Sequence, residues 1–425
     1  MLIRTCPLSL VVLLFSACSV AFSASQRPQS HNMTLFAAGY NGTIIPYSLN
    51  PTDPAIKPIS PGVQPNASGT SPSWIAFSSS SRKTDTLYAV TDFYSVDEAS
   101  PGRVFSHTYD PSTGAIVQSG SPTQRSNGTS AGGDGPVSCL VGHGPSKNLL
   151  FVANYNSGTA SVIPINPPDG TLAEEPKEVF QFTRPSNQPK IGPVADRQDH
   201  SYAHQVSISP SGRWVYVCDL GADQIHHLRI HPNGEVKFTA STDVKVGSGP
   251  RHITFHKDCK GQVSAYLASE LDNTVSSFKV NEDTGELKLI GDPILASPPG
   301  VPLSGEGILP TNRTTAEIAV VPAGDFVYVS NRGDEVEDHI SIFKRDQQTG
   351  ELSFQEWVKS GGRMPRHFSL SSDTRRDDQA KWLVVGHQTD QNIVVYERDA
   401  TTGKLAKRDT RPDVGQVAFT GFSPF

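Results

Sequence analysis

The sequence predicts an all-β fold, a seven-bladed β-propeller, and three of its features support this prediction. First, the stretch from Tyr202 to Leu289 holds two similar copies of a unit, each with three short strands of alternating apolar pattern. Second, an apolar strand that ends in a polar corner recurs seven times along the chain. Third, one extra strand follows the last copy and lacks a partner of its own. Repeats of about 40 to 60 residues with three or four strands are typical of propeller blades.

The recurring apolar strand is the best-defined element of each unit. Its seven copies lie at residues 35–40, 87–92, 150–155, 215–220, 265–270, 326–332 and 383–388. We name the strands of a unit a, b, c and d, and the recurring copy is strand b. Strand a precedes strand b, as at residues 205–209 and 252–255.

A tight turn follows strand c in several units. An aspartate or asparagine followed by Thr-Gly marks this turn at residues 109–114, 280–287, 344–352 and 397–405. The Asp or Asn side chain can accept backbone hydrogen bonds, and glycine adopts the positive φ that such a hairpin needs. The turn therefore predicts a short strand d after strand c.

The two ends of the repeat predict that the ring closes on itself. The first unit begins almost directly with strand b, whereas residues 415–419 resemble a strand a without its strand b. Pairing between them would complete blade one and remove an open sheet edge. We therefore assign residues 26–425 to one propeller. Three insertions rich in Pro, Gly, Ser or Asn, at 119–134, 184–200 and 297–315, are interpreted as loops between neighbouring blades.

Composition and charge argue against other classes of protein. The 425 residues include 36 glycines and 33 prolines, which suits many strands joined by tight turns. The formal net charge is −6 and the pI is about 6.1. A nucleic-acid-binding protein would show a basic face or domain, so no nucleic-acid partner is predicted.

Residues 1–25 predict a signal peptide. A short basic start, Met1–Arg4, precedes an apolar core at 8–15 and small residues through Ser25. The apolar core is too short to span a bilayer, and we expect no membrane span elsewhere. Residues 15–18 also loosely resemble a bacterial lipid-attachment box, which is the alternative. The first interpretation predicts a secreted protein.

Glycosylation sequons and cysteines bear on the same question. Asn-X-Ser/Thr sequons begin at Asn32, Asn41, Asn66, Asn127 and Asn312, which favours a secreted glycoprotein. After removal of the leader three cysteines remain, Cys139, Cys218 and Cys259. Their spacing matches no zinc motif, and the odd number leaves at least one thiol unpaired. Any disulfide pairing stays open, as does the oligomeric state.

Blade geometry alone selects a candidate site. Strands a and b run antiparallel, so the start of a and the end of b share one face of the disc, beside the central channel. The starts of strand a carry His204, Arg251 and Arg366. The ends of strand b carry Asp92, Tyr155, Leu220, Glu270, Arg332 and Gln388, and Asn154 and Asp219 lie one position earlier. We expect these positions to converge on one mouth of the channel.

This set of side chains points to an anionic substrate. Arginine keeps its charge and binds carboxylate or phosphate with two parallel hydrogen bonds. Histidine titrates near neutral pH, and a carboxylate beside arginines stays ionised. The combination suits proton transfer on an anion, or the opening and closing of a lactone with an arginine stabilising the oxyanion. Rim salt bridges on a solvated surface are the structural alternative.

Five motifs together resemble one protein family. They are A-H-Q-V-S-I-S-P-S-G-R-W-V-Y-V-C-D-L-G-A-D at 203–223, G-S-G-P-R-H-I-T-F-H at 247–256, A-S-E-L-D-N-T-V at 268–275, V-Y-V-S-N-R-G at 327–333 and G-G-R-M-P-R-H-F-S-L at 361–370. In these motifs the chain is similar to the seven-bladed lactonase propellers. That family includes bacterial-type 6-phosphogluconolactonases and fungal carboxy-cis,cis-muconate cyclases.

The resemblance implies roles for particular residues. The catalytic set of the cyclase branch, a histidine, two arginines and a glutamate, falls on His204, Arg251, Arg332 and Glu270. The two arginines would hold the substrate carboxylate or phosphate, and Glu270 and His204 would handle the proton. Substrate-binding residues are then expected at Arg366, Asn154, Asp219 and Gln388.

Other polar residues are weaker candidates. His252 and His367 follow the arginines and are expected to point the other way along strand a. Calcium-dependent lactonase propellers use axial Glu, Asn and Asp ligands, which Glu270, Asn154 and Asp219 could imitate. The neighbouring arginines would repel a cation, so we predict no metal and no cofactor.

Two functions of different class follow from these features. The first is a secreted lactonase-type enzyme that opens or forms a lactone on a small anionic substrate. Its partner would be that lactone or its open acid. The second is an inactive, glycosylated propeller that serves as a binding or adhesion module, because a fold alone does not decide function.

Overall fold

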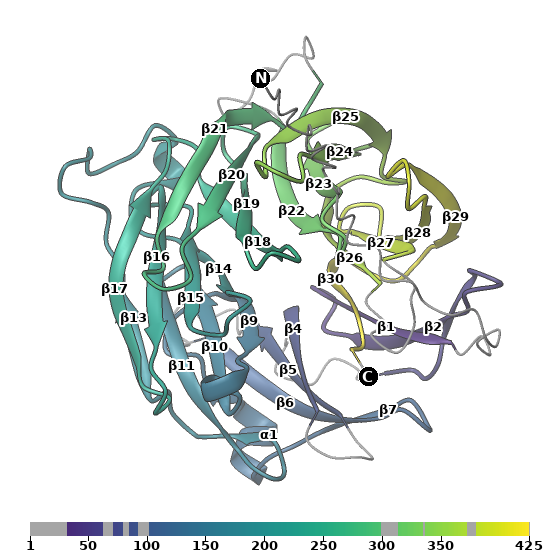
Figure 1. Cartoon of the computed structure of the whole chain (residues 1–425). Coiled ribbons are helices and arrows are strands. Elements are labelled where there is room, and N and C mark those ends of the chain that lie inside the picture. Colours follow the sequence, from purple (N-terminus) through teal and green to yellow (C-terminus); the bar gives the residue numbers. More distant parts are fainter. Residues whose placement is uncertain are drawn as a thin grey trace, which may run out of the picture.

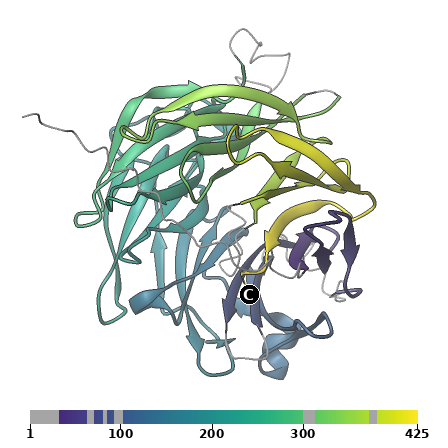
Figure 2. The same ribbon diagram turned by 45° about the vertical axis from the view of Figure 1, so that its right-hand side comes forward.

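In the computed structural model, seven antiparallel sheets form the blades of a propeller around a central channel, as the sequence predicts. The structure describes residues 32–62, 71–79, 85–91, 102–298, 313–334, 336–371 and 380–424. Figure 1 looks into the ring, and Figure 2 shows the same ring turned by 45°.

Each blade is one sheet whose strands follow one another outward from the channel. Blade 1 consists of β30 (Val417–Phe422), β1 (Met33–Gly39), β2 (Ile44–Leu49) and β3 (Ile56–Pro58). Blade 2 consists of β4 (Pro72–Ser79), β5 (Asp85–Thr91), β6 (Arg103–Asp110) and β7 (Ala115–Gln118), with β8 (Thr129–Ser130) paired to β6. Blade 3 consists of β9 (Pro136–Val141), β10 (Leu149–Asn154) and β11 (Thr159–Asn166), with β12 (Thr171–Leu172) and β13 (Glu178–Gln181) both paired to β11. Blade 4 consists of β14 (Ala203–Ile208), β15 (Trp214–Asp219), β16 (Gln224–Ile230) and β17 (Val236–Asp243).

The last three blades repeat the pattern. Blade 5 consists of β18 (Pro250–Lys257), β19 (Val263–Ser269), β20 (Thr274–Val280) and β21 (Leu287–Leu295). Blade 6 consists of β22 (Thr314–Val320), β23 (Phe326–Arg332), β24 (His339–Arg345) and β25 (Leu352–Lys359). Blade 7 consists of β26 (Pro365–Leu370), β27 (Trp382–His387), β28 (Asn392–Arg398) and β29 (Leu405–Arg411). The described helical segments are α1 (Pro122–Asn127) and the 3-10 turns η1 (Gly144–Ser146) and η2 (Ala195–Arg197).

The core lies between blades, which explains the unbroken apolar run of each strand b. In β10, Leu150 and Val152 pack against blade 2, whereas Phe151 and Ala153 pack against blade 4. Successive side chains of a strand point to opposite faces, and both faces of a blade are covered by neighbours. Among the described residues, seven such apolar clusters each join one pair of adjacent blades. Each fully buried Leu or Phe contributes roughly 1.5–3 kcal/mol.

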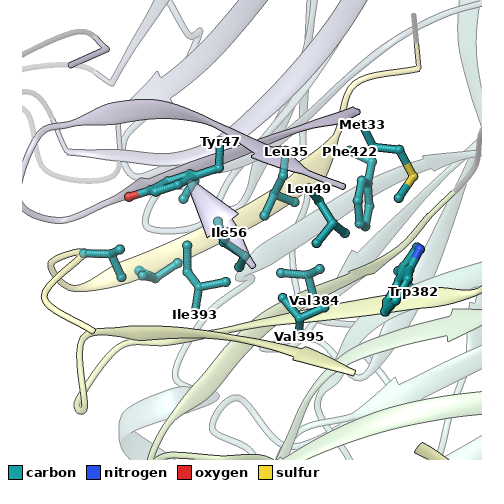
Figure 3. Close-up of a cluster of buried hydrophobic side chains, with 13 residues drawn as sticks. Met33, Leu35, Tyr47, Leu49, Ile56, Trp382, Val384, Ile393, Val395 and Phe422 are labelled. Atoms are coloured by element: carbon teal, nitrogen blue, oxygen red, sulfur yellow. The ribbon is translucent and has the colours of Figure 1, made fainter. Parts of the chain in front are cut away.

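The C-terminal strand closes the ring, as the sequence predicts. β30 pairs antiparallel with β1, with Leu35 opposite Phe422 and Ala38 opposite Phe419. Figure 3 shows the cluster behind this closure, in which Phe422 packs near Met33 of blade 1 and Trp382 of blade 7. One cluster therefore ties both ends of the described chain to the last blade.

Two of the three insertions join neighbouring blades and hold short elements of their own. Residues 119–134 contain α1 and β8 and lead into β9, and residues 184–200 contain η2 and lead into β14. Both therefore connect neighbouring blades as expected, and the first also carries a helix and a short strand that pairs with β6. Most of 297–315 lies outside the described residues, and its last residues already belong to β22.

A repeated hydrogen bond from a tyrosine locks the glycine turns of blades 3, 5, 6 and 7 to the blade before each, and in the last three of these blades the turn is the predicted Thr-Gly turn. Tyr216 in blade 4 donates to the Gly285 carbonyl of blade 5 at 2.9 Å, and Tyr328 in blade 6 donates to the Gly403 carbonyl of blade 7 at 2.6 Å. Tyr88 and Tyr266 make the same contact with the carbonyls of Gly170 and Gly350. We call this contact the tyrosine latch.

Each innermost strand carries a β-bulge where it begins. The pairing of β18 with β19 sets Pro250 opposite Ser269 and His252 opposite Ala268, so Arg251 is the extra residue. The extra residues in blades 1–5 and 7 are Ala418, Ser73, Val137, His204, Arg251 and Arg366, and in blade 6 the pairing skips Ala316 and Glu317. A bulge bends its strand and redirects side chains. It therefore determines what faces the channel.

Candidate active site

A cavity of about 570 Å³ opens on one face of the ring, at the mouth of the channel. Its wall contains Tyr40, Ser71, Val137, Tyr155, Asn156, Arg197, His204, Glu270, Arg332, Arg366, Gln388 and Gln416. These residues come from all seven blades, mostly from starts of innermost strands and ends of the next strand. Five of the eight predicted site residues therefore lie in one cavity wall, and its volume suits a small molecule.

The carboxylate of Glu270 lies at the centre of a cluster of arginines. Arg197 Nη2 lies 2.8 Å and Arg332 Nη2 lies 3.2 Å from its Oε1, and Arg251 Nε lies 2.9 Å from its Oε2. The Glu270, Arg251 and Arg332 side chains are buried, whereas the Arg197 side chain is 30% exposed. Arg251 lies directly behind the cavity wall and completes the predicted group of His204, Arg251, Glu270 and Arg332.

These charges fix the protonation of the acid and of the imidazole. Burial alone would raise the pKa of Glu270, but the charges of Arg332, Arg197 and Arg251 hold it below its ordinary value. Burial and then the four arginine charges, led by Arg251, hold the pKa of His204 well below its ordinary value. At neutral pH the carboxylate is therefore ionised and His204 is neutral.

The opposite side of the cavity is also polar. The Arg366 guanidinium lies over the Tyr40 ring at 5.4 Å from its centroid. Among the described residues, none hydrogen-bonds Nδ1 of His204 or Oε1 of Gln388, although both atoms are buried. Buried polar atoms in native proteins are normally satisfied. These two are consistent with a cavity that receives a polar ligand.

The family to which the chain belongs follows from sequence comparison. The sequence model of the family described as "Lactonase, 7-bladed beta-propeller" matches residues 34–422. This chain belongs to that lactonase family. The 6-phosphogluconolactonase of Bacillus subtilis (strain 168) is 32% identical over 272 residues, which cover 64% of this chain and 69% of that protein. The solved structure of a periplasmic gluconolactonase from Pseudomonas aeruginosa has a TM-score of 0.74 and 25% identity, covering 92% of this chain and 99% of that one.

Two predicted substrate-binding residues lie outside the cavity wall of this lactonase-family chain. Asn154 Nδ2 donates to the Ala131 carbonyl and to Thr159 Oγ1, each at 3.0 Å. Asp219 accepts the backbone N–H groups of Tyr202 and Ala222 and lies 3.0 Å from His226 Nε2. Both side chains are fully buried. They stabilise turns within their blades, so their assignment to the substrate-binding wall is corrected.

Sequence reasoning missed Arg197 and gave Tyr155 no role. Arg197 lies in η2 of the 184–200 insertion, and its Nε donates to the Tyr155 hydroxyl at 3.0 Å. The neighbouring Gln198 donates to the Leu220 carbonyl, and Val194 packs on Leu220 and Leu271. The insertion is thus anchored on blades 4 and 5. The sequence shows a long insertion before a strand a, and this length was the available signal. The sequence does not show the path that the insertion takes.

The expectation for His252 and His367 is wrong. Strand alternation would turn them away from the channel, but the bulge sets both residues after the extra arginine toward Glu317. The Glu317 carboxylate lies 3.0 Å from His252 Nδ1 and 3.0 Å from His367 Nε2. The Trp74 ring packs edge-on against both imidazoles. These residues close the channel beneath the cavity.

Several other predictions concern the rest of the molecule. Cys139, Cys218 and Cys259 are free, and burial raises the pKa of the first two thiols. Within the described ranges, no group of three or more His, Cys, Asp or Glu could hold a metal ion, and no helix is both long and apolar enough for a membrane span.

The signal-peptide and glycosylation assignments stay predictions. Asn32, Asn41 and Asn127 are exposed. The leader 1–25, Asn66, Asn312 and the strand-end residue Asp92 lie outside the described residues.

Proposed function

We propose that this chain hydrolyses a lactone that carries a phosphate or carboxylate group, as a 6-phosphogluconolactonase does. One observation carries the proposal: the guanidinium groups of Arg197, Arg251 and Arg332 contact a single carboxylate, Glu270, at a cavity whose wall also contains Arg366. Glu270 offsets one of the three charges that contact it. The surplus favours a ligand with negative charge of its own.

The arginines have two tasks in this proposal. Arg332 is fixed by the Thr315 carbonyl at 2.9 Å and by Glu270, and Arg251 is fixed by the Ala316 carbonyl at 2.7 Å. Guanidinium groups held in place can stabilise the oxyanion that forms when the lactone carbonyl is attacked, with little reorganisation. Arg197 and Arg366, which are less buried, are assigned to the substrate's phosphate or carboxylate.

His204 is the better proton acceptor of the two candidates. Three arginines hold Glu270 ionised, which makes it a weak base. Burial, and after it the charges of the arginines, keeps the pKa of His204 low and the ring unprotonated in the free protein. A bound anion would offset those charges and raise the His204 pKa toward neutrality. His204 would then take a proton from water as the oxygen adds to the carbonyl, and return it to the ring oxygen when the C–O bond breaks.

A panel of lactones tests the proposal. We expect hydrolysis of 6-phosphogluconolactone above its spontaneous rate, and a kcat/KM at least about tenfold higher than for uncharged gluconolactone, because the surplus charge stabilises only the former. A carboxylated muconolactone distinguishes phosphate from carboxylate preference and tests the cyclase-type reaction. Acid release in a pH-stat measures turnover.

Two outcomes would contradict the proposal. Absence of turnover with every lactone would favour the binding-module alternative. Equal turnover of charged and uncharged lactones would show that the site does not recognise an anionic group on the substrate. Glu270→Gln should lose turnover of all substrates, and Arg213→Ala, whose partner Asp283 lies far from the cavity on an exposed turn, serves as the charge-removal control.

A further inference from the structure

Tyr155 is a residue of the cavity wall whose side chain contacts both the imidazole of His204 and the guanidinium of Arg197. It follows directly after β10 in blade 3, and its ring is half-buried. The ring packs against that of Tyr202, with centroids 4.6 Å apart, and edge-on against His204 at 5.5 Å. The phenol is therefore held beside the imidazole to which we assign the proton.

The Tyr155 hydroxyl uses only part of its hydrogen-bonding capacity. Its oxygen accepts from Arg197 Nε at 3.0 Å, and a guanidinium can only donate, so the phenol's own proton points elsewhere. Among the residues that the structure describes, none accepts that proton. Because Tyr155, Arg197 and Glu270 all line the cavity, the proton is available to an oxygen atom bound there.

The phenol keeps its proton at neutral pH. Burial raises the pKa of Tyr155 above its ordinary value near 10, although the Arg197 charge opposes that rise. The ionised Glu270 carboxylate can only accept hydrogen bonds, whereas a neutral phenol can donate one. Tyr155 therefore supplies an uncharged donor to a cavity whose other donors beside Glu270 are guanidinium groups.

We propose that Tyr155 is a catalytic residue that donates a hydrogen bond to the ring oxygen of the lactone as its C–O bond breaks. The inference rests on the proposed function, in which Arg251 and Arg332 receive the carbonyl oxygen and His204 returns a proton to the ring oxygen. Both oxygens are bound to one carbon. A carbonyl directed toward blades 5 and 6 leaves the ring oxygen on the side of blades 3 and 4, where Tyr155 and His204 lie.

The step needs no net proton transfer from the phenol. Negative charge develops on the ring oxygen as the C–O bond breaks, and a donor already in place stabilises it with little reorganisation. His204 then delivers to that oxygen the proton that it took from water. The Tyr155 proton stays on the phenol throughout.

Tyr155→Phe removes the hydroxyl and keeps the ring. We expect kcat for 6-phosphogluconolactone to fall about tenfold to a hundredfold, as for loss of one hydrogen bond to a charged atom. KM should change by no more than about threefold, because Arg197 keeps its contact with Glu270. Uncharged gluconolactone should show the same relative loss of kcat, because it has the same ring oxygen. Acid release in a pH-stat measures both.

The competing explanation is that Tyr155 only holds Arg197 in place. Tyr155→Phe would then raise KM for the phosphorylated lactone, leave kcat unchanged and leave gluconolactone turnover as it was. That pattern would overturn the catalytic role, as would wild-type kinetics with both substrates. Tyr202→Phe is the matched control, since it loses a hydroxyl that donates to Asp199 at 2.8 Å, outside the cavity wall. This control should retain wild-type kinetics.

A binding measurement separates this inference from the proposed function. In 6-phosphogluconate, the open acid, the former ring oxygen is a hydroxyl that can accept from Tyr155. Calorimetry should show that Tyr155→Phe weakens the binding of 6-phosphogluconate about twofold to tenfold and leaves that of inorganic phosphate unchanged. If the wild type hydrolyses no lactone but shows this difference, the proposed function fails while the contact of Tyr155 with the substrate oxygen stands. If Tyr155→Phe retains both wild-type turnover and wild-type binding of 6-phosphogluconate, the role of Tyr155 is refuted while the lactonase function remains.

Discussion

At the scale of single residues, Glu270 shows how neighbours decide what a side chain can do. The sequence identified it as a site residue because it ends a strand b beside a channel. It could not show that three arginines from different segments would contact the same carboxylate at 2.8–3.2 Å. Those contacts favour a fixed anion that organises the arginines, so we assign the proton transfer to His204.

Arg197 carries a prediction that follows from its partial exposure. Its guanidinium contacts Glu270 and the Tyr155 hydroxyl, yet its side chain remains 30% exposed, unlike those of Arg251 and Arg332. An entering anion would meet it first. Arg197→Ala should remove one charge-assisted contact of about 1.5–3 kcal/mol, and so raise KM roughly tenfold to a hundredfold with a smaller change in kcat.

Steady-state kinetics at two salt concentrations check this expectation. The variant should also lose part of the salt dependence of kcat/KM, because a charge at the mouth of the cavity has been removed. Arg197→Lys should recover little, since one ammonium cannot bridge Tyr155 and Glu270 as the guanidinium does. An unchanged KM in Arg197→Ala would show that Arg197 serves only to anchor its loop.

At the scale of elements, the bulges mark where sequence reasoning stops. Alternation along the chain predicted the strands of the blades, and the seven sheets confirm them. The same rule turned His252 and His367 away from the channel, and it failed there because a bulge adds one residue to the inner strand. Nothing local in the sequence marks the bulge. It could be recognised only because the pairing partners of β18 and β26 are known.

The tyrosine latch fixes the Thr-Gly turns of blades 5, 6 and 7 to their neighbours, and it is testable. Gly403 has φ of 72°, and an added Cβ would lie 2.5 Å from the Phe326 ring. Gly403→Ala should therefore combine backbone strain with a clash and destabilise by about 1–3 kcal/mol, while Tyr328→Phe should cost about 0.5–1.5 kcal/mol. Urea denaturation midpoints measure both.

Gly261→Ala is the matched control for this experiment. Gly261 also has a positive φ, 83°, but an added Cβ would meet no atom within 4 Å. Its loss of stability reports the backbone strain alone. If Gly403→Ala were no more destabilising than Gly261→Ala, the turn would not be packed against the neighbouring blade in the way described here.

At the scale of the whole molecule, ring closure brings distant residues to one site. The seven strand b segments and the unpaired C-terminal strand were enough to predict the closed ring, because each blade buries both faces and needs two neighbours. Part of the site could also be predicted from the sequence, because the order of the strands determines which residues lie at the mouth of the channel. The structure was needed for the rest of the site. Loops and bulges that span blades place Arg197, bury Asn154 and Asp219, and set His252 and His367 against Glu317.

Burial of histidines throughout the ring predicts that acid destabilises the fold. Burial lowers the pKa of His107, His227 and His387 to about 4 and that of His367 to about 3. In the unfolded chain these groups titrate near 6.5. Between these values the unfolded state binds more protons than the native state, so stability is lost as pH falls from about 6.5 toward 4. Each histidine contributes about 1.4 kcal/mol per pH unit in that window.

A single substitution can isolate the contribution of one buried histidine to the pH dependence of stability from the opposing contributions of buried carboxyl groups. The buried carboxyls of Asp223, Asp272 and Asp338 have raised pKa values and act in the opposite sense, so the total slope is a balance. His107 is 4% exposed, and its Nδ1 has no hydrogen-bond partner among the described residues. His107→Leu should therefore lose stability less steeply than the wild type between pH 6.5 and 4, by up to about 1.4 kcal/mol per unit. Urea titrations across this range measure the difference, and parallel curves would mean that His107 is protonated in the native ring.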